Sequence, residues 1–151
     1  MKRVQFPRLG EVCCETVLDN GLKIQVVPRP GYLKSYAFFA TSYGGMNVRF
    51  RKDGVWQETP AGVAHFLEHK MFDTKEGNAL QKLTANGASA NAFTAAAMTA
   101  YYFDCTERFE ENLRTLLSFV SQGYFTQESV DKEQGIIGQE IGMIEDNPEW
   151  Q

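Results

Sequence analysis

The run His65-Phe66-Leu67-Glu68-His69 holds the side chains of this sequence that are best suited to catalysis, and its two histidines are the only ones in the chain. A helix turns by about 100° per residue, so both imidazoles and the Glu68 carboxylate would face the same side. Neutral imidazole is a favoured zinc ligand, and a carboxylate beside the metal can take a proton from bound water and pass it to a leaving amine. The spacing therefore indicates zinc-dependent hydrolysis of a peptide bond.

The order His-x-x-Glu-His reverses the more familiar His-Glu-x-x-His, because the candidate base precedes the second histidine. Other interpretations of this pair stay open at this point. Histidines four residues apart on a helix can serve capping or packing, or can lie on the surface by accident. Two histidines and a carboxylate can also bind non-haem iron, although helical spacing with an adjacent glutamate favours zinc.

A catalytic zinc ion needs a third protein ligand, and without a further histidine or a suitably placed cysteine this must be a carboxylate. The last predicted helix, residues 126–146, offers Glu133 and Glu140, which lie seven residues apart and so nearly on one line. Both lie beside an apolar stripe, where a carboxylate is costly unless it is paired or binds a metal. A salt bridge to a lysine or arginine is the alternative role. We expect the stripe to be buried; it consists of Val130, Ile137, Ile141 and Ile144.

Three glycines fall on another face of the same helix: Gly135, Gly138 and Gly142. Each costs about 1 kcal/mol relative to alanine in a helix interior. We expect the close approach of another helix or of a partner segment to compensate for this cost, with simple tolerance as the alternative.

Strands are predicted both before and after the histidine motif in the sequence. Residues 14–18 and 22–27 have the pattern of a hairpin, with a turn at Asp19-Asn20-Gly21. A third strand is expected over 35–43, ended by Gly44-Gly45, with a continuation through 48–50 left open. Two more are expected over 88–94 and 98–106.

Four helices are predicted between and after these strands. The first should have Thr59 as its N-cap and Pro60 at its first helical position, and should carry the histidine motif within 61–72. The others are expected over 78–85, from 109 to about 120, and over 126–146.

The interleaving of helices with hairpins and crossovers predicts an α+β fold with a largely antiparallel sheet and helices packed on one face. A length of 151 residues with 43% apolar content suits one domain or a large piece of one. A large aromatic residue, Trp150, follows directly after a helix break at Pro148. We therefore expect residues 1–151 to be an incomplete fragment of a longer protein.

Composition argues against several classes of partner. The net charge is −4 and the lysines and arginines are scattered, so nucleic acid is not expected. No apolar run approaches the length of a membrane helix, and no secretory signal is recognisable. The three cysteines, Cys13, Cys14 and Cys105, fit neither a disulfide framework nor a zinc ribbon and are expected to be small buried residues. A reducing cytoplasm is the expected location.

Together these motifs resemble the insulinase or pitrilysin type of zinc peptidase, the inverted-motif group (inverzincins) that includes the mitochondrial processing peptidase. The resemblance is carried by Gly62–His69, by Asn91–Thr94, and by Lys132–Glu140. Two further runs, Lys70–Phe72 and Asp146–Trp150, are similar to bacterial YmfH-like members.

The resemblance implies a role for each residue of the candidate site. His65, His69 and Glu140 would bind Zn²⁺, and Glu68 would act first as general base and then as general acid. Glu133 would be a carboxylate that orients the site without binding the metal.

The resemblance also implies how a substrate binds. The strand that contains Asn91, Ala92 and Phe93 would bind an unfolded peptide as an added strand. For Asn91 a structural role in a turn or ladder is equally expected.

Members of this family pair two related halves around a closed chamber. The resemblance thus implies that 1–151 is the N-terminal catalytic domain of a zinc endopeptidase for short or unfolded peptides, which needs a second homologous half or a partner subunit. The isolated chain is then expected to be inactive. The alternative is a non-catalytic partner subunit, although such subunits usually lack parts of the motif and this sequence fills every ligand position.

Overall fold

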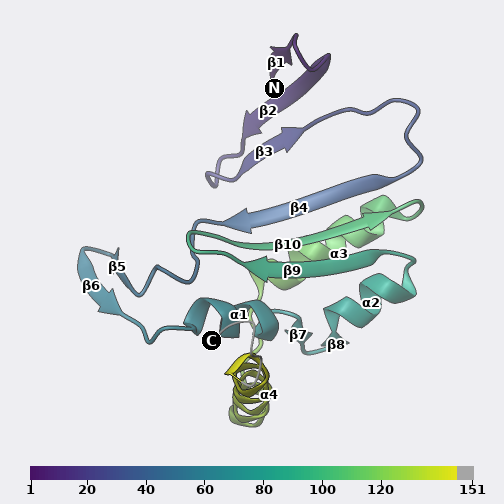
Figure 1. Cartoon of the computed structure of the whole chain (residues 1–151). Helices are drawn as coiled ribbons and strands as arrows, with labels where there is room; N and C mark the ends of the chain where they lie inside the picture. The colour runs from purple at the N-terminus through teal and green to yellow at the C-terminus, as the bar shows by residue number, and fades with distance from the viewer. Residues whose placement is uncertain (146–151) are drawn as a thin grey trace. The chain divides into compact units, whose positions relative to one another are not determined.

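The computed structural model describes residues 1–145 and divides them into two compact units, one up to Leu33 and one from Lys34 onward (Figure 1). The first unit is an antiparallel sheet in the order β1-β2-β3, formed by β1 (Lys2–Phe6), β2 (Glu11–Val17) and β3 (Lys23–Val26). The predicted hairpin is β2–β3, and its turn contains Gly21 at a φ of 85°. Strand β1 was not predicted.

The second unit is built on another antiparallel sheet, in the order β4-β10-β9. Its strands are β4 (Ser35–Thr41), β9 (Ser89–Thr94) and β10 (Thr99–Cys105), all close to the predicted ranges. The continuation through 48–50 belongs instead to a separate hairpin of β5 (Arg49–Lys52) and β6 (Val55–Glu58). A second small hairpin pairs β7 (Asp73–Thr74) with β8 (Gly77–Asn78).

The four predicted helices are present as α1 (Val63–Lys70), α2 (Ala79–Ala85), α3 (Phe109–Ser121) and α4 (Gln127–Glu145). The predicted start of α1 is wrong, because Gly62 and not Thr59 stands at its N-cap. Gly62 has a left-handed φ of 88°, and its carbonyl accepts the first helical hydrogen bond, from Phe66 N–H. Residues 61 and 62 therefore form a turn before the helix, and Pro60 precedes that turn.

The core lies on one face of the β4-β10-β9 sheet. Successive residues of a strand point to opposite faces. Ala37 and Phe103 point inward and pack with Leu83 of α2 and with Leu116 and Phe119 of α3. Figure 1 shows α2 and α3 beside these strands. The other face carries four partly exposed aromatic side chains: Tyr36, Phe38, Phe93 and Tyr102.

The predicted α+β class, with antiparallel sheets and helices on one face, is confirmed. Cys13, Cys14 and Cys105 are free and buried, as expected. No helix within residues 1–145 is long and apolar enough to cross a membrane.

Candidate metal centre

Helix α1 presents two different rows of side chains, and each row meets a different neighbour. Ala64 and Glu68 are four residues apart, share one line along the helix, and are both buried. His65 and His69 form the next line, one residue further round. Because α1 contacts β9 and β10 as well as α4, the first row can face the sheet while the histidines face α4.

The two histidines and Glu140 of α4 come together at one point, although 71 residues separate Glu140 from His69 in sequence. The His65 Nε2 and His69 Nε2 atoms are 3.2 Å apart, and Glu140 Oε2 is 3.8 Å from each of them. The point in their plane that is equidistant from all three lies about 2.1 Å from each atom, and zinc bonds to nitrogen and oxygen measure roughly 2.0–2.2 Å. These three side chains therefore fit a zinc ion.

Solvent can reach this point. The His65 and Glu140 side chains are 43% and 40% exposed, whereas His69 is 24% exposed. A catalytic zinc site needs an open position for water or substrate beside its three protein ligands. The exposure of these ligands satisfies that requirement.

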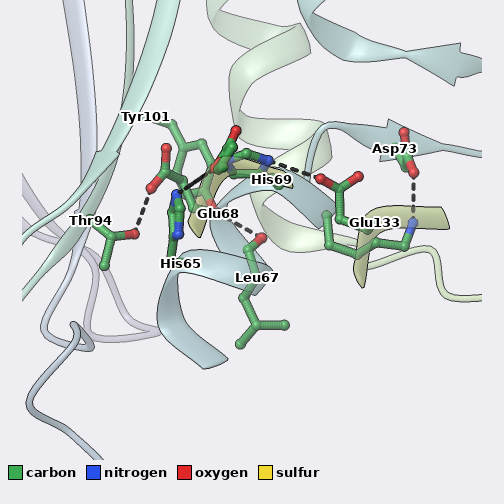
Figure 2. Close-up of polar contacts among 10 residues, drawn as sticks. His65, Leu67, Glu68, His69, Asp73, Thr94, Tyr101 and Glu133 are labelled. Carbon is green, nitrogen blue, oxygen red and sulfur yellow. Dashed lines mark hydrogen bonds and ion pairs between the residues drawn. The ribbon is translucent and has the colours of Figure 1, made fainter. Parts of the chain in front are cut away.

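Glu133 lies behind His69 and not beside the other two ligands. Its Oε1 is 2.9 Å from His69 Nδ1, and its side chain is only 12% exposed (Figure 2). An ionised carboxylate can only accept, so Nδ1 carries the hydrogen, and in the neutral ring Nε2 then keeps its lone pair. This contact favours the His69 tautomer in which Nε2 can bind a metal.

The Glu68 side chain is buried and points toward the sheet. Thr94, the last residue of β9, donates a hydrogen bond from Oγ1 to Glu68 Oε2 at 2.6 Å (Figure 2). Tyr101 of β10 also lies near this carboxylate, and its hydroxyl donates a long hydrogen bond of 3.4 Å to the Leu67 carbonyl. Burial raises the pKa of the Tyr101 hydroxyl, and the negative charge of Glu68 raises it further, so Tyr101 stays neutral beside the carboxylate.

The residues predicted to bind substrate lie on β9, which stands at the end of the β4-β10-β9 sheet. Asn91 and Phe93 point to the open face of the sheet, and Ala92 points to the core side. The Asn91 side chain accepts a hydrogen bond from the Ala92 N–H at 2.8 Å. A peptide strand that paired with this amide would therefore have to displace the Asn91 side chain.

Helix α4 differs from prediction in its apolar stripe. Val130 and Ile137 are only partly buried and Ile141 is 52% exposed, while the Ile144 side chain lies outside the described residues. Glu133 and Glu140 face α1 instead, and the His69 imidazole offsets the cost of burying Glu133. Of the predicted compensations for the glycines, the close approach of another helix is not found within the described residues, which leaves a partner segment or simple tolerance. No atom there lies within 4 Å of a Cβ built at Gly135, Gly138 or Gly142.

Sequence reasoning missed Thr94, Tyr101 and Lys70. Lys70 directly follows the second histidine and is fully buried, with Nζ 2.7 Å from Asp73 Oδ2 and 5.7 Å from the centre of the Phe125 ring. Strand alternation could have found Thr94, because it shares its face with Ala92, whereas the packing of Lys70 has no local sequence signal.

Comparison with known proteins gives the family of this chain. The sequence profile of the insulinase family (peptidase family M16) matches residues 51–151. The chain is 45% identical to the "uncharacterized zinc protease YmfH" of Bacillus subtilis over 152 residues, which cover 99% of this chain and 36% of that protein. It is 29% identical to human insulin-degrading enzyme over 141 residues, covering 88% of this chain and 13% of the enzyme.

A solved structure shows the same fold. The crystal structure of an M16-like peptidase from Alicyclobacillus acidocaldarius superposes with a TM-score of 0.89 at 43% identity, covering 97% of this chain and 34% of that one. The chain thus spans about a third of the length of its bacterial relatives. The resemblance drawn from the motifs is confirmed, and the chain belongs to the insulinase family of peptidases, family M16.

Proposed function

We propose that this chain is the zinc-binding, catalytic part of a metalloendopeptidase. The observation that carries the proposal is the convergence of His65 Nε2, His69 Nε2 and Glu140 Oε2 from two helices at separations that suit one zinc ion. Two relatives named zinc proteases support the choice of metal. Because the chain spans only about a third of such relatives, activity is proposed for a longer protein or for a complex with a partner chain.

Each residue of the site has a distinct task in this proposal. When bound, zinc lowers the pKa of a coordinated water toward neutrality. Glu68 takes the proton of the attacking water on one carboxylate oxygen and later delivers it to the leaving amine nitrogen. Glu133 keeps the His69 ring oriented through Nδ1, and Tyr101 remains neutral and holds the Leu67 carbonyl.

We propose that the substrate is a short or unfolded peptide that pairs with β9. This strand ends the sheet, so an extended peptide backbone can add to it, whereas a folded protein rarely offers a free extended segment. Asn91 would leave its bond to Ala92 N–H when the peptide binds. A second half or partner subunit would close the other side of the peptide.

The alternative is a non-catalytic partner domain. Such a domain has no need of a base, yet Glu68 is kept buried beside the histidines and bonded to Thr94. This observation favours the enzyme. We also propose a cytoplasmic location, since three free, buried thiols suit a reducing compartment.

Zinc titration of the purified chain tests the ligand assignment. We expect one tight site in the wild type, and loss of that site in His65→Ala and in Glu140→Ala. Glu128→Ala is the matched control, because Glu128 is an exposed carboxylate on the same helix. Unchanged stoichiometry in Glu140→Ala would refute the assignment, and metal analysis of the purified protein separates zinc from iron.

Glu68→Gln tests the base. In the longer protein this variant should bind zinc normally and lose peptide hydrolysis by about 100-fold or more, because general-base catalysis contributes roughly 10²–10⁴-fold. Near-normal turnover in Glu68→Gln would show that another group acts as the base.

A further inference from the structure

The contact between Thr94 and Glu68 belongs to a short chain of hydroxyl groups. Thr94 and Thr99 are directly opposite each other in the β9–β10 ladder, and their Oγ1 atoms lie 3.3 Å apart. Thr99 Oγ1 donates to the Tyr43 carbonyl at 2.8 Å, while Thr94 Oγ1 lies 2.6 Å from Glu68 Oε2. This series of hydroxyl contacts thus connects α1, through β9 and β10, to the loop after β4.

The chemistry of hydroxyl groups fixes the direction of these bonds. A threonine hydroxyl has one hydrogen to donate and two lone pairs. Thr99 uses its hydrogen on the Tyr43 carbonyl, so toward Thr94 it can only accept. Thr94 gives its own hydrogen to the carboxylate, which is the nearer and the charged acceptor.

The Tyr43 end of this chain is also held in place. Gly44 packs against the turn between β9 and β10, where an added Cβ would lie 2.4 Å from the Ala95 carbonyl oxygen and from the Met98 nitrogen. Gly45 N–H donates to the same Ala95 oxygen at 2.9 Å. The carbonyl that orients Thr99 therefore belongs to a packed loop.

We infer that Thr94 is a positioning residue for the general base, an inference that rests on the proposed function of Glu68. Its hydroxyl donates a hydrogen bond to Glu68 Oε2. Oε1 accepts no hydrogen bond from any residue between 1 and 145, so in this proposal it is the oxygen that takes the proton of the reacting water. A glutamate side chain has three rotatable bonds, so a fixed oxygen reduces the number of orientations that the carboxylate samples. Such positioning acts on the chemical step.

This role makes a specific kinetic prediction. Thr94 contacts Glu68 and none of the three proposed zinc ligands, so its loss should lower kcat and leave zinc stoichiometry and KM nearly unchanged. Thr94→Val keeps the shape of the side chain and removes the hydroxyl. Because a hydrogen bond to a charged group is worth more than a neutral one, we expect kcat to fall about tenfold or more.

Two further variants separate positioning from folding. Thr94→Ser restores the hydroxyl and should keep kcat within about threefold of the wild type, since the same charged hydrogen bond can form. Thr84→Val is the matched control, because this exposed hydroxyl bonds only to the Leu80 carbonyl of its own helix. It should leave kcat unchanged.

A spectroscopic measurement tests the contact without any turnover. In the 151-residue chain labelled with ¹³C at the glutamate carboxyl carbons, the resonance lost in Glu68→Gln identifies Glu68. Thr94→Val should shift this resonance, whereas Thr94→Ser and Thr84→Val should not. If the longer protein cleaves no peptide, the proposed function fails, and this spectrum still decides whether Thr94 holds the carboxylate.

A Thr94→Val protein with wild-type kcat and an unshifted Glu68 resonance would overturn the inference. So would a Thr94→Ser protein that is as impaired as Thr94→Val, because a shared loss would point to packing and not to the hydroxyl.

Discussion

The contact between Glu133 and His69 allows a quantitative test of the site, because Glu133 touches a proposed ligand but would not touch the metal. Its Oε1 is 2.9 Å from His69 Nδ1, and both side chains are less than a quarter exposed. A hydrogen bond to a charged group in such a place contributes about 1.5–3 kcal/mol. At about 1.4 kcal/mol per factor of ten, its full loss corresponds to roughly 10- to 100-fold in zinc affinity.

We therefore expect Glu133→Ala to weaken zinc binding by about 10- to 100-fold without abolishing it, since His65, His69 and Glu140 all remain. Glu133→Gln keeps an amide oxygen near Nδ1 but removes the charge, so its zinc affinity should lie between those of the wild type and of Glu133→Ala.

Competition with a chromophoric zinc chelator at fixed pH measures this difference directly. The exposed Glu128→Ala on the same helix controls for a change of helix charge and should keep wild-type affinity. The reasoning fails if Glu133→Ala binds zinc as tightly as wild type. It also fails if zinc binding is lost as completely as in Glu140→Ala, because Glu133 would then act as a ligand.

Three predictions concern stability of the chain, measured by denaturant unfolding. Gly138→Ala should raise the free energy of unfolding by about 0.5–1 kcal/mol, because its Cβ meets open space on a helix; a loss would reveal a packing partner there. Gly44→Ala should lower it by about 2 kcal/mol or more, since the new Cβ would clash with the Ala95 carbonyl oxygen, and a neutral result would show that the loop relaxes. Asp73→Ala should lower it by about 3 kcal/mol, because the buried Lys70 ammonium loses its ion pair. An unchanged midpoint there would mean that water replaces the carboxylate.

The histidine motif was predictable because its geometry is local. Helical spacing alone places His65 and His69 on one side of α1, and the structure keeps both rings there. The helical wheel also selected Glu133 and Glu140 from the carboxylates of α4. The wheel could not distinguish the roles of the two carboxylates, which only the family resemblance suggested. In the structure Glu133 lies at His69 Nδ1, and Glu140 lies near the Nε2 atoms of both histidines.

The missed contacts join residues that are distant in sequence. Thr94 and Glu68 are 26 residues apart, and Thr99 and Tyr43 are 56 apart. Strand alternation can therefore give the face on which Thr94 lies, but it cannot identify the partner of either threonine. The start of α1 was missed for a different reason. Pro60 after Thr59 has the composition of a helix start, but the left-handed Gly62 delays the first helical hydrogen bond by one turn.

The error on the α4 stripe shows what orients this helix. Hydrophobic patterning predicts that the isoleucines face inward, yet Ile141 is half exposed while Glu133 is buried. Burying a carboxylate is favourable here only because His69 Nδ1–H meets it. Glu140 Oε2, at 3.8 Å from both Nε2 atoms, is too far away for a hydrogen bond but close enough to share a cation with them. The side of α4 that faces α1 therefore carries Glu133 and Glu140, and apolar burial alone does not account for this orientation.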